Sequence, residues 1–513
     1  MVPRAHISLS EASHGTTSNG EHPPPLSARW APWLQKAIAC LLILFAVLLP
    51  HSIKGGQRAW RLAFLLWLVK LGMTRQRPFD QPLTAPLLTY VTLSGISTAL
   101  SPDPYLSWDR MKIVCLVLLG VLFAQSLKRL SQIRILVCLL LLSGLAAAGF
   151  TAWQYAYGIG VRVNHTVPGT RIYAAGIIDN DIITTINGHS VRTVSQLQRT
   201  VASSPAQTPM RIDYLRGFPF QRLETAASRA DFVSSGYGTS RLQFSRGKPS
   251  RAQGTLGHYV VFAEMLMQIG CLAWAMFLGV QSRQRTLRVL FGVIFLAVTA
   301  SLVATQTRAA LVGLGMGCLL AVFWLTEKRV RIWTALALVL LLALGALWIN
   351  HSRGVNWASK DDPGTKFRML MWEDGLRLVR EHPWFGVGME TVRMHWQEWN
   401  LRGFILYHVQ SHFHSTLLQI AVERGLTTLA AWLWFVVAYF TFLVRLLRKA
   451  RGRSRFATAV VAAVLSGFVA FLVTSWVHYN LGEETLVMVF FFYFGLAIAI
   501  DHLLTVPGGM DVA

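Results

Sequence analysis

The stretch that decides the fold is ILVCLLLLSGLAAAGF at residues 135–150, which is almost entirely apolar. Two further runs have the same character, CLLILFAVLLP at 40–50 and TALALVLLLALGALWI at 334–349. With their flanks, these runs approach the roughly 20 residues that cross a bilayer as a helix. Spanning β-strands would alternate polar and apolar residues, and these runs do not. The sequence therefore predicts an all-α polytopic membrane protein.

The composition of the whole chain agrees with this class. Of the 513 residues, 53% are hydrophobic and only 14% are charged, whereas soluble domains carry about 25% charged residues. The formal charge of +24 is better explained by membrane orientation and anionic lipid than by nucleic acid, so no nucleic-acid partner is expected. Neither a disulfide framework nor a thiolate metal cluster is expected, because all five cysteines fall inside apolar runs: Cys40, Cys115, Cys138, Cys271 and Cys318.

The apolar segments predict about twelve transmembrane helices. They lie near 34–52, 58–74, 83–100, 109–127, 134–157, 258–280, 286–304, 308–326, 330–350, 425–447, 456–478 and 484–505. The short basic connections, such as KRLSQIR at 128–134, follow even-numbered spans. The positive-inside rule therefore places them and both termini in the cytoplasm.

This topology divides the chain into alternating membrane and outer parts. We expect a flexible cytoplasmic tail at 1–30, without a cleavable signal peptide. The spans then fall in 31–157, 258–350 and 425–513, with an outer insertion at 158–257 and an outer loop at 351–424. The short junction TQTR at 305–308 is expected on the same outer side as the two long segments.

The outer insertion resembles a small α/β domain of the PDZ type around 169–217. NDIITTINGHSV predicts strand–turn–strand, VSQLQRTV a helix and MRIDYLRG a strand. Asn187-Gly188 is a strong hairpin signal, because both residues tolerate positive φ. Two interpretations stay open: a domain that binds a peptide or protein, and an α/β insertion without such a ligand.

The outer loop at 351–424 holds the clearest candidates for chemistry. TKFRMLMWEDGLRLVREH at 365–382 predicts a helix that places Arg368 and Trp372 on one face, and Pro383 ends it. SHFHSTLLQIAVERG at 411–425 follows, with His412 and His414 ahead of a short amphipathic helix. Two histidines two residues apart on a helix point in opposite directions, and no carboxylate or thiolate joins them at ligand spacing, so no metal site is expected.

The histidines leave two interpretations, an interfacial hydrogen-bonded side chain or a general base with a suitable pKa near neutrality. Outward arginines favour the second. Arg308 begins a span on the outer side, Arg251 precedes another, and Arg368 lies on the outer helix. Guanidinium groups bind phosphate oxygens in bidentate fashion, so their convergence with a histidine suggests an anionic ligand.

One glycine-rich motif predicts packing instead of binding. GLGMG at 313–317 lies inside a span with no preceding strand, so close helix packing is expected there and a nucleotide loop is not.

Several motifs of the outer segment resemble the O-antigen ligase/polymerase family of bacterial membrane glycosyltransferases. The family pattern combines an Arg-x-x-x-Trp helix, a Pro-x-x-Gly-x-Gly turn and His-x-His-[Asn/Ser]-x-x-Leu-x-x-x-x-Glu-x-Gly. It is matched here by Arg368 and Trp372; Pro383, Gly386 and Gly388; and His412, His414, Ser415, Leu418, Glu423 and Gly425. TQTRAALVGL and RAQGTLGHYVVFAEML are also similar, with His258 where asparagine is commoner. The PDZ-like insertion departs from the usual plan.

The resemblance implies a GT-C-like, metal-independent and inverting enzyme without a cofactor. It would transfer glycan from undecaprenyl diphosphate at the periplasmic face of the bacterial inner membrane, in lipopolysaccharide biosynthesis. For a ligase, the acceptor is a sugar hydroxyl of lipid A-core. His414 would take the hydroxyl proton, and Arg308, Arg368 and Arg251 would bind the diphosphate. His412, Trp372, Glu423 and His258 would support them.

Two alternatives to the ligase remain at this stage. An O-antigen polymerase would use a second lipid-linked glycan as acceptor, and the motifs do not separate it from a ligase. A lipid or polysaccharide transporter would carry ionisable residues midway along its spans. Glu264 is the one acid found well inside a predicted span, which disfavours transport.

Overall fold

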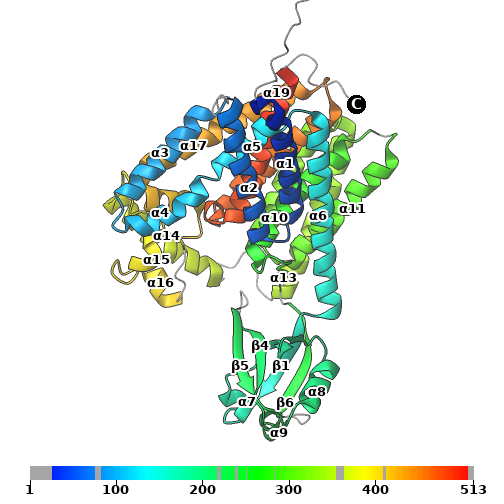
Figure 1. Cartoon of the computed structure of the whole chain (residues 1–513), viewed down its shortest axis with the longest axis vertical. Coiled ribbons are helices and arrows are strands. Elements are labelled where there is room, and N and C mark those ends of the chain that lie inside the picture. The colour runs from blue at the N-terminus through cyan, green and yellow to red at the C-terminus, as the bar shows by residue number, and fades with distance from the viewer. Residues whose placement is uncertain are drawn as a thin grey trace, which may run out of the picture.

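A bundle of long helices with a small β domain at one end makes up the computed structural model of this chain (Figure 1). The structure describes residues 26–74, 82–216, 221–236, 241–249, 251–281, 283–353, 363–407 and 412–505.

Nine helices in these ranges are long and apolar enough to cross a membrane. They are α1 (Leu26–Leu48), α6 (Leu130–Tyr157), α10 (Tyr259–Gly279), α11 (Arg285–Ala304), α12 (Arg308–Leu325), α13 (Lys328–Arg353), α17 (Thr416–Ala450), α18 (Arg455–Ser475) and α19 (Glu484–Thr505). This architecture agrees with the predicted polytopic, helical class.

Three of the twelve predicted spans are not among the nine. They correspond to α2 (Ile53–Thr74), α3 (Thr84–Ala99) and the pair α4 (Pro104–Val114) and α5 (Val117–Ser126). α2 is long enough, but four lysines and arginines interrupt its apolar character. α3 has 16 residues, and α4 and α5 have 11 and 10. Helices of this length extend roughly 15–24 Å, less than the hydrocarbon core of about 30 Å. The count of twelve stays a prediction.

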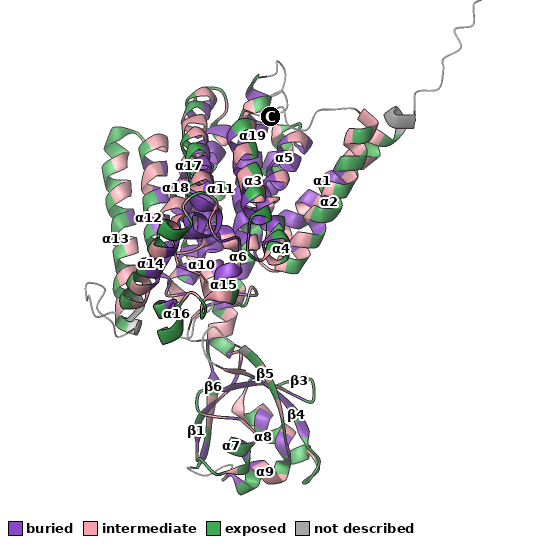
Figure 2. Ribbon diagram, turned by 90° about the vertical axis from the view of Figure 1, so that its left-hand side faces the viewer, coloured by how far each residue is buried: buried purple, intermediate pink, exposed green. Residues whose placement is uncertain are grey.

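Close approach of helices explains the glycine motif in α12. A Cβ on Gly313 would lie 2.6 Å from the sulfur of Met267 in α10 and 3.0 Å from the carbonyl oxygen of Ala470 in α18. One on Gly317 would lie 2.6 Å from the carbonyl oxygen of Ser466. The packing interpretation of GLGMG is confirmed, because α12 lies close against α10 and α18 at these glycines. The most buried helices of the bundle are α10, α18 and α19 (Figure 2).

The β domain is one antiparallel sheet with three short helices. Its strands are β1 (Gly160–Thr166), β2 (Ile182–Ile186), β3 (His189–Ser190), β4 (Met210–Arg216), β5 (Gln221–Ala227) and β6 (Leu242–Gly247), and its helices are α7 (Arg171–Ala174), α8 (Val194–Ser203) and α9 (Arg229–Ser234). The sheet order is β5-β4-β2-β1-β6, with β3 paired to β2.

The β2–β3 hairpin turns at Asn187 and Gly188, both at positive φ. β2, the turn, β3, α8 and β4 all lie where the sequence predicts them. The sheet also includes β1 and β6, outside the predicted core at 169–217, and the relation to PDZ domains stays a prediction.

Residues 363–407 form a separate helical layer beside the β-domain end of the bundle (Figure 1). It contains α14 (Pro363–Glu381), α15 (Thr391–His395) and α16 (Arg402–Tyr407). Phe404 and Met371 belong to a small apolar core that ties this layer to Val422 at the start of α17. The histidine motif lies between this layer and α17.

Candidate active site

A cavity of about 580 Å³ opens at the end of the bundle where α10 begins. Its wall combines residues from α4, α10, α14, the loop before α17 and the connection between α18 and α19. Four imidazoles, three arginines and three carboxylates line it: His258, His412, His414 and His478; Arg110, Arg368 and Arg393; and Glu264, Glu390 and Glu483. The charged groups of both signs suit a polar, anionic ligand with exchangeable protons.

The histidine motif is held in one conformation by contacts on both sides. Trp372 Nε1 of α14 donates to the carbonyl oxygen of Phe413 at 3.1 Å, and the amide N–H of Phe413 donates to Gln419 at 2.8 Å. His414 has a φ of 51°, which is uncommon for a residue other than glycine. Ser415 then caps α17 by accepting from the N–H of Leu418 at 3.5 Å. Trp372 thus positions the motif and does not line the cavity.

Burial keeps both histidines of the motif neutral. The ring of His414 lies 4.3 Å from that of His412 and 5.2 Å from that of Phe367, between centroids. Burial, then the neighbouring His478 and His258, lower the pKa of His412 to about 4. Burial, then His412 and Arg368, lower the pKa of His414 to about 2. His414 Nε2 is buried and forms no hydrogen bond with any described residue, so its hydrogen-bonding capacity is unused.

Gly425 and the PWFGVG loop at 383–388 form the kink within α17. Gly425 has φ 80° and ψ 170° inside α17. The preceding turn of helix exposes carbonyl groups, and the PWFGVG loop satisfies them: the N–H of Val387 donates to Val422 at 2.9 Å, and that of Gly388 to Glu423 at 2.8 Å. Gly386, at φ 68°, leaves no room for a Cβ against the same backbone. Gly425 and the PWFGVG loop therefore position the histidine motif at the start of α17.

Glu423 links the helical layer of α14–α16 to the bundle. Its carboxylate accepts from the backbone N–H of Glu390 at 2.9 Å and from the hydroxyl of Tyr479 at 3.1 Å. Arg424, also buried, donates to the hydroxyls of Tyr90 and Tyr479. Glu423 is therefore a positioning residue that lies behind the cavity wall.

The predicted arginines occupy different places. Arg368 lines the cavity. The guanidinium of Arg251 lies 4.8 Å from the ring centroid of Tyr259, and Tyr259 in turn lines the cavity. Arg308 is the first residue of α12, at the same end of the bundle, but is not among the described residues of the wall. His258 caps α10 through Nδ1, which accepts from Val261 N–H at 3.5 Å, and burial lowers its pKa.

Several residues of the wall carry no signal in the sequence, namely Arg110, Glu390 and His478, and for Glu264 the sequence shows only that an acid lies within a span. Arg110 of α4 pairs with Glu390 at 2.7 Å. His478 Nδ1 lies 2.6 Å from a carboxylate oxygen of Glu264. Both pairs join segments hundreds of residues apart, in contacts that no local pattern indicates. No group of three or more His, Cys, Asp or Glu side chains in the described ranges is placed to hold a metal ion.

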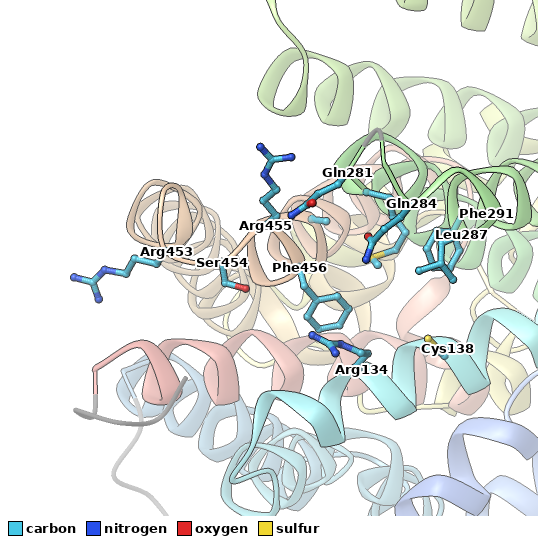
Figure 3. A pocket seen from close by; sticks show the side chains of 14 residues that line it. Arg134, Cys138, Gln281, Gln284, Leu287, Phe291, Arg453, Ser454, Arg455 and Phe456 are labelled. Carbon is cyan, nitrogen blue, oxygen red and sulfur yellow. The ribbon is translucent and has the colours of Figure 1, made fainter. Parts of the chain in front are cut away.

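A second cavity, of about 480 Å³, lies at the opposite end of α10 and has a different character. Apolar side chains such as Phe291 and Phe456 line it together with Arg134, Arg453 and Arg455. Figure 3 shows Arg453 and Arg455 directed away from one another, and Arg134 beneath the ring of Phe456. Its described lining contains no imidazole or carboxylate, in contrast to the histidine cavity.

A comparison with protein families finds a match for the part of the chain that contains the histidine motif. Residues 291–433 match the model of the family described as O-antigen ligase. This match supports membership of the O-antigen ligase family. The match includes Arg308, Arg368, Trp372, His412, His414 and Glu423, whereas Arg251, His258 and His478 lie outside it. No curated protein matches the chain.

The match to this family supports a broad function. It indicates a membrane enzyme of the ligase or polymerase type, glycosyltransferase-like, that acts in lipopolysaccharide biosynthesis. The family is one of the bacterial inner membrane.

Proposed function

We propose that this protein is an O-antigen ligase that transfers glycan from undecaprenyl diphosphate to a sugar hydroxyl of lipid A-core. The observation that carries the proposal is the meeting of His412, His414 and Arg368 around one cavity at the end of a membrane-spanning bundle. A guanidinium and an imidazole are the two groups that a phosphate leaving group and a hydroxyl nucleophile require.

The cavity suits a donor that is anchored in lipid. Arg368 would bind the diphosphate through charge-assisted hydrogen bonds and stabilise the negative charge that builds up as it leaves. Arg308 and Arg251, at the same end of the bundle, would contact donor atoms outside the wall. These guanidiniums would supply the positive charge, so we propose a reaction without a metal ion.

His414 is proposed as the group that meets the acceptor. The hydroxyl oxygen forms a bond to the anomeric carbon from the side opposite the diphosphate, and the carbon–oxygen bond to the diphosphate breaks with its electron pair. The hydroxyl proton passes to His414 Nε2, whose lone pair has no partner among the described residues. Attack from the opposite side inverts the anomeric configuration.

The periplasmic side is proposed from the distribution of charge. Basic residues line two adjoining cavities at the far end of α10, among them Arg288 in the first turn of α11, and Arg451 and Arg453 in the connection between α17 and α18. The positive-inside rule assigns such an end to the cytoplasm. α10 has 21 residues, or about 30 Å of helix, so the histidine cavity at its start would lie at the periplasmic surface.

Deletion in the native host tests the ligase against the polymerase. We expect lipid A-core without attached polysaccharide, while full-length polymer persists on the lipid carrier. The wild-type gene should restore attachment, and the His414→Gln form should not. Loss of long polymer from the carrier itself would instead indicate a polymerase and contradict the proposal.

A further inference from the structure

The four imidazoles of the cavity differ in which ring nitrogen can act as a base. In a neutral imidazole, one nitrogen carries the proton and the other accepts. Nδ1 of His258 accepts from Val261 N–H, and Nδ1 of His412 accepts from His414 N–H at 3.2 Å. In both rings the proton must therefore lie on Nε2, which can only donate. These two histidines are not proton acceptors.

His478 has the opposite arrangement. Its Nδ1 lies 2.6 Å from Glu264, and a carboxylate only accepts, so Nδ1 carries the proton and Nε2 keeps its lone pair. Glu264 has 1% of its side chain exposed and His478 has 12%. Thr474 of α18 donates to the second oxygen of Glu264 at 3.3 Å, which fixes the carboxylate. A buried carboxylate that orients an imidazole and stabilises its charged form is the arrangement of a general base.

His414 Nε2 has no hydrogen-bond partner among the described residues and can take up a proton in the tautomer protonated on Nδ1, but a proton cannot rest there. A cationic ring at position 414 would lie among His412, His478 and Arg368, with no carboxylate bonded to it in the described chain. Bound diphosphate would offset Arg368 during the reaction, yet it departs with the product. A proton taken up by His414 therefore needs a second acceptor within the same cavity.

We propose that His478, oriented by Glu264, is a second acid–base residue of this site and the final acceptor of the hydroxyl proton. This inference rests on the proposed glycan transfer. As the new glycosidic bond forms, the proton leaves the hydroxyl oxygen and reaches His478 Nε2 through His414 or water in the cavity. Glu264 neutralises the imidazolium, which then returns the proton to solvent. His478 acts as a catalytic residue, and Glu264 as its positioning residue.

His478→Gln separates proton transfer from structure. The glutamine amide can still donate to Glu264, so the bond that ties α10 to the α18–α19 connection is kept, but no titratable base remains. With purified full-length protein, lipid-linked glycan and rough lipopolysaccharide, we expect transfer to fall at least 100-fold with a nearly unchanged melting temperature. His502→Gln, an exposed histidine at the other end of the bundle, is the matched control and should keep full activity.

Glu264→Gln gives a readout that a purely structural role would not move. The charged and titratable groups around His478 are Arg110 of α4, His258 and Glu264 of the α10 start, Arg368 of α14, Glu390 and Arg393 near α15, His412 and His414, and Tyr479 and Glu483 of its own connection. Of these, Glu264 is the one bonded to it. Without that carboxylate the imidazolium is less stable, so the acidic limb of the pH–rate profile should move to lower pH as the plateau falls.

The outcomes separate this inference from the proposed function. His478→Gln with activity within threefold of wild type would overturn it, as would unfolding of both variants or a lowered plateau with an unmoved acidic limb in Glu264→Gln. In those cases His414→Gln would still be inactive, and the proposed function would stand. Absence of joined product from the wild-type protein would instead overturn the proposed function itself.

Discussion

Gly425 and Trp384 lie so close together that a Cβ on residue 425 would fall 2.0 Å from the carbonyl oxygen of Trp384. The N–H of Leu426 meanwhile donates to the carbonyl of Pro383 at 2.7 Å. The break in α17 is thus locked into the loop that follows α14. This contact sets the direction in which the histidine motif enters the cavity.

Gly425→Ala should therefore displace the histidine motif, although residue 425 does not line the cavity. A residue with a side chain at φ 80° and ψ 170° is strained by about 1–3 kcal/mol, and the collision adds to this. We expect a lower melting temperature and loss of transfer. Gly149→Ala in α6 is the control, because no atom lies within 4 Å of the added Cβ. Equal melting temperatures for the two variants would refute this role of Gly425.

Trp372→Phe tests whether α14 positions the histidine motif. The substitution keeps an aromatic ring but removes the N–H that donates to Phe413. A net hydrogen bond of about 1 kcal/mol corresponds to roughly fivefold in rate, so a fall of that order in kcat is expected. Trp333→Phe, whose side chain is 75% exposed, should leave kcat unchanged. Equal kcat values for both variants would exclude Trp372 from positioning the motif.

The local motifs of the outer loop could be predicted from the sequence, and the wall of the cavity could not. Arg368 and Trp372 are four residues apart on a helix, so their shared face follows from periodicity. His478 and Glu264 are 214 residues apart, and each lies in a segment whose pattern indicates only a span or a short connection. Their pairing arises from the packing of α10 against α18, which no local spacing encodes.

The arginines also show that the sequence predicts local position but not which side chains line the cavity. The edges of the spans place Arg308 and Arg251 at the end of the bundle where the histidine cavity lies, since hydropathy fixes where a helix begins. Which arginine reaches the cavity depends on side-chain direction and on the tilt of α12 and α14, and there Arg368 differs from Arg308. In the β domain, β1 and β6 went unpredicted because each pairs with a strand about 80 residues away.

Arg368→Gln should weaken the donor site more than any other single arginine change on α14. Loss of charge-assisted hydrogen bonds worth about 1.5–3 kcal/mol corresponds to a fall of roughly 10- to 100-fold in kcat/KM for the donor. Arg380→Gln, an exposed arginine on the same helix, is the matched control and should leave kcat/KM unchanged. A comparable effect in both would indicate general electrostatics and not a diphosphate contact.

The neutral histidines predict a loss of stability in acid. Unfolding returns His412 and His414 to ordinary pKa values near 6.5, whereas in the fold the pKa is about 4 for His412 and about 2 for His414. Between pH 6.5 and 4 the unfolded chain binds more protons, so the free energy of unfolding falls as the pH falls. The melting temperature should drop across this range, and less so in His412→Gln. His189→Gln, exposed in the β domain, should follow wild type; an unchanged slope in His412→Gln would contradict the assignment.

Sidedness can be measured with single cysteines in a background freed of the native ones. A cysteine at Glu398, exposed beside α15, should react with a membrane-impermeant maleimide in intact spheroplasts. A cysteine at Arg283, in the connection between α10 and α11, should react only after lysis. The reverse pattern would place the histidine cavity in the cytoplasm and remove its access to periplasmic substrates.

Reconstitution of the purified protein with lipid-linked glycan and rough lipopolysaccharide tests the central proposal most directly. We predict that the wild-type protein joins glycan to lipid A-core in the presence of EDTA, releases undecaprenyl diphosphate, and loses this activity in His414→Gln. Formation of longer lipid-linked glycan without joined product, activity that requires an added divalent cation, or full activity of His414→Gln would contradict the account.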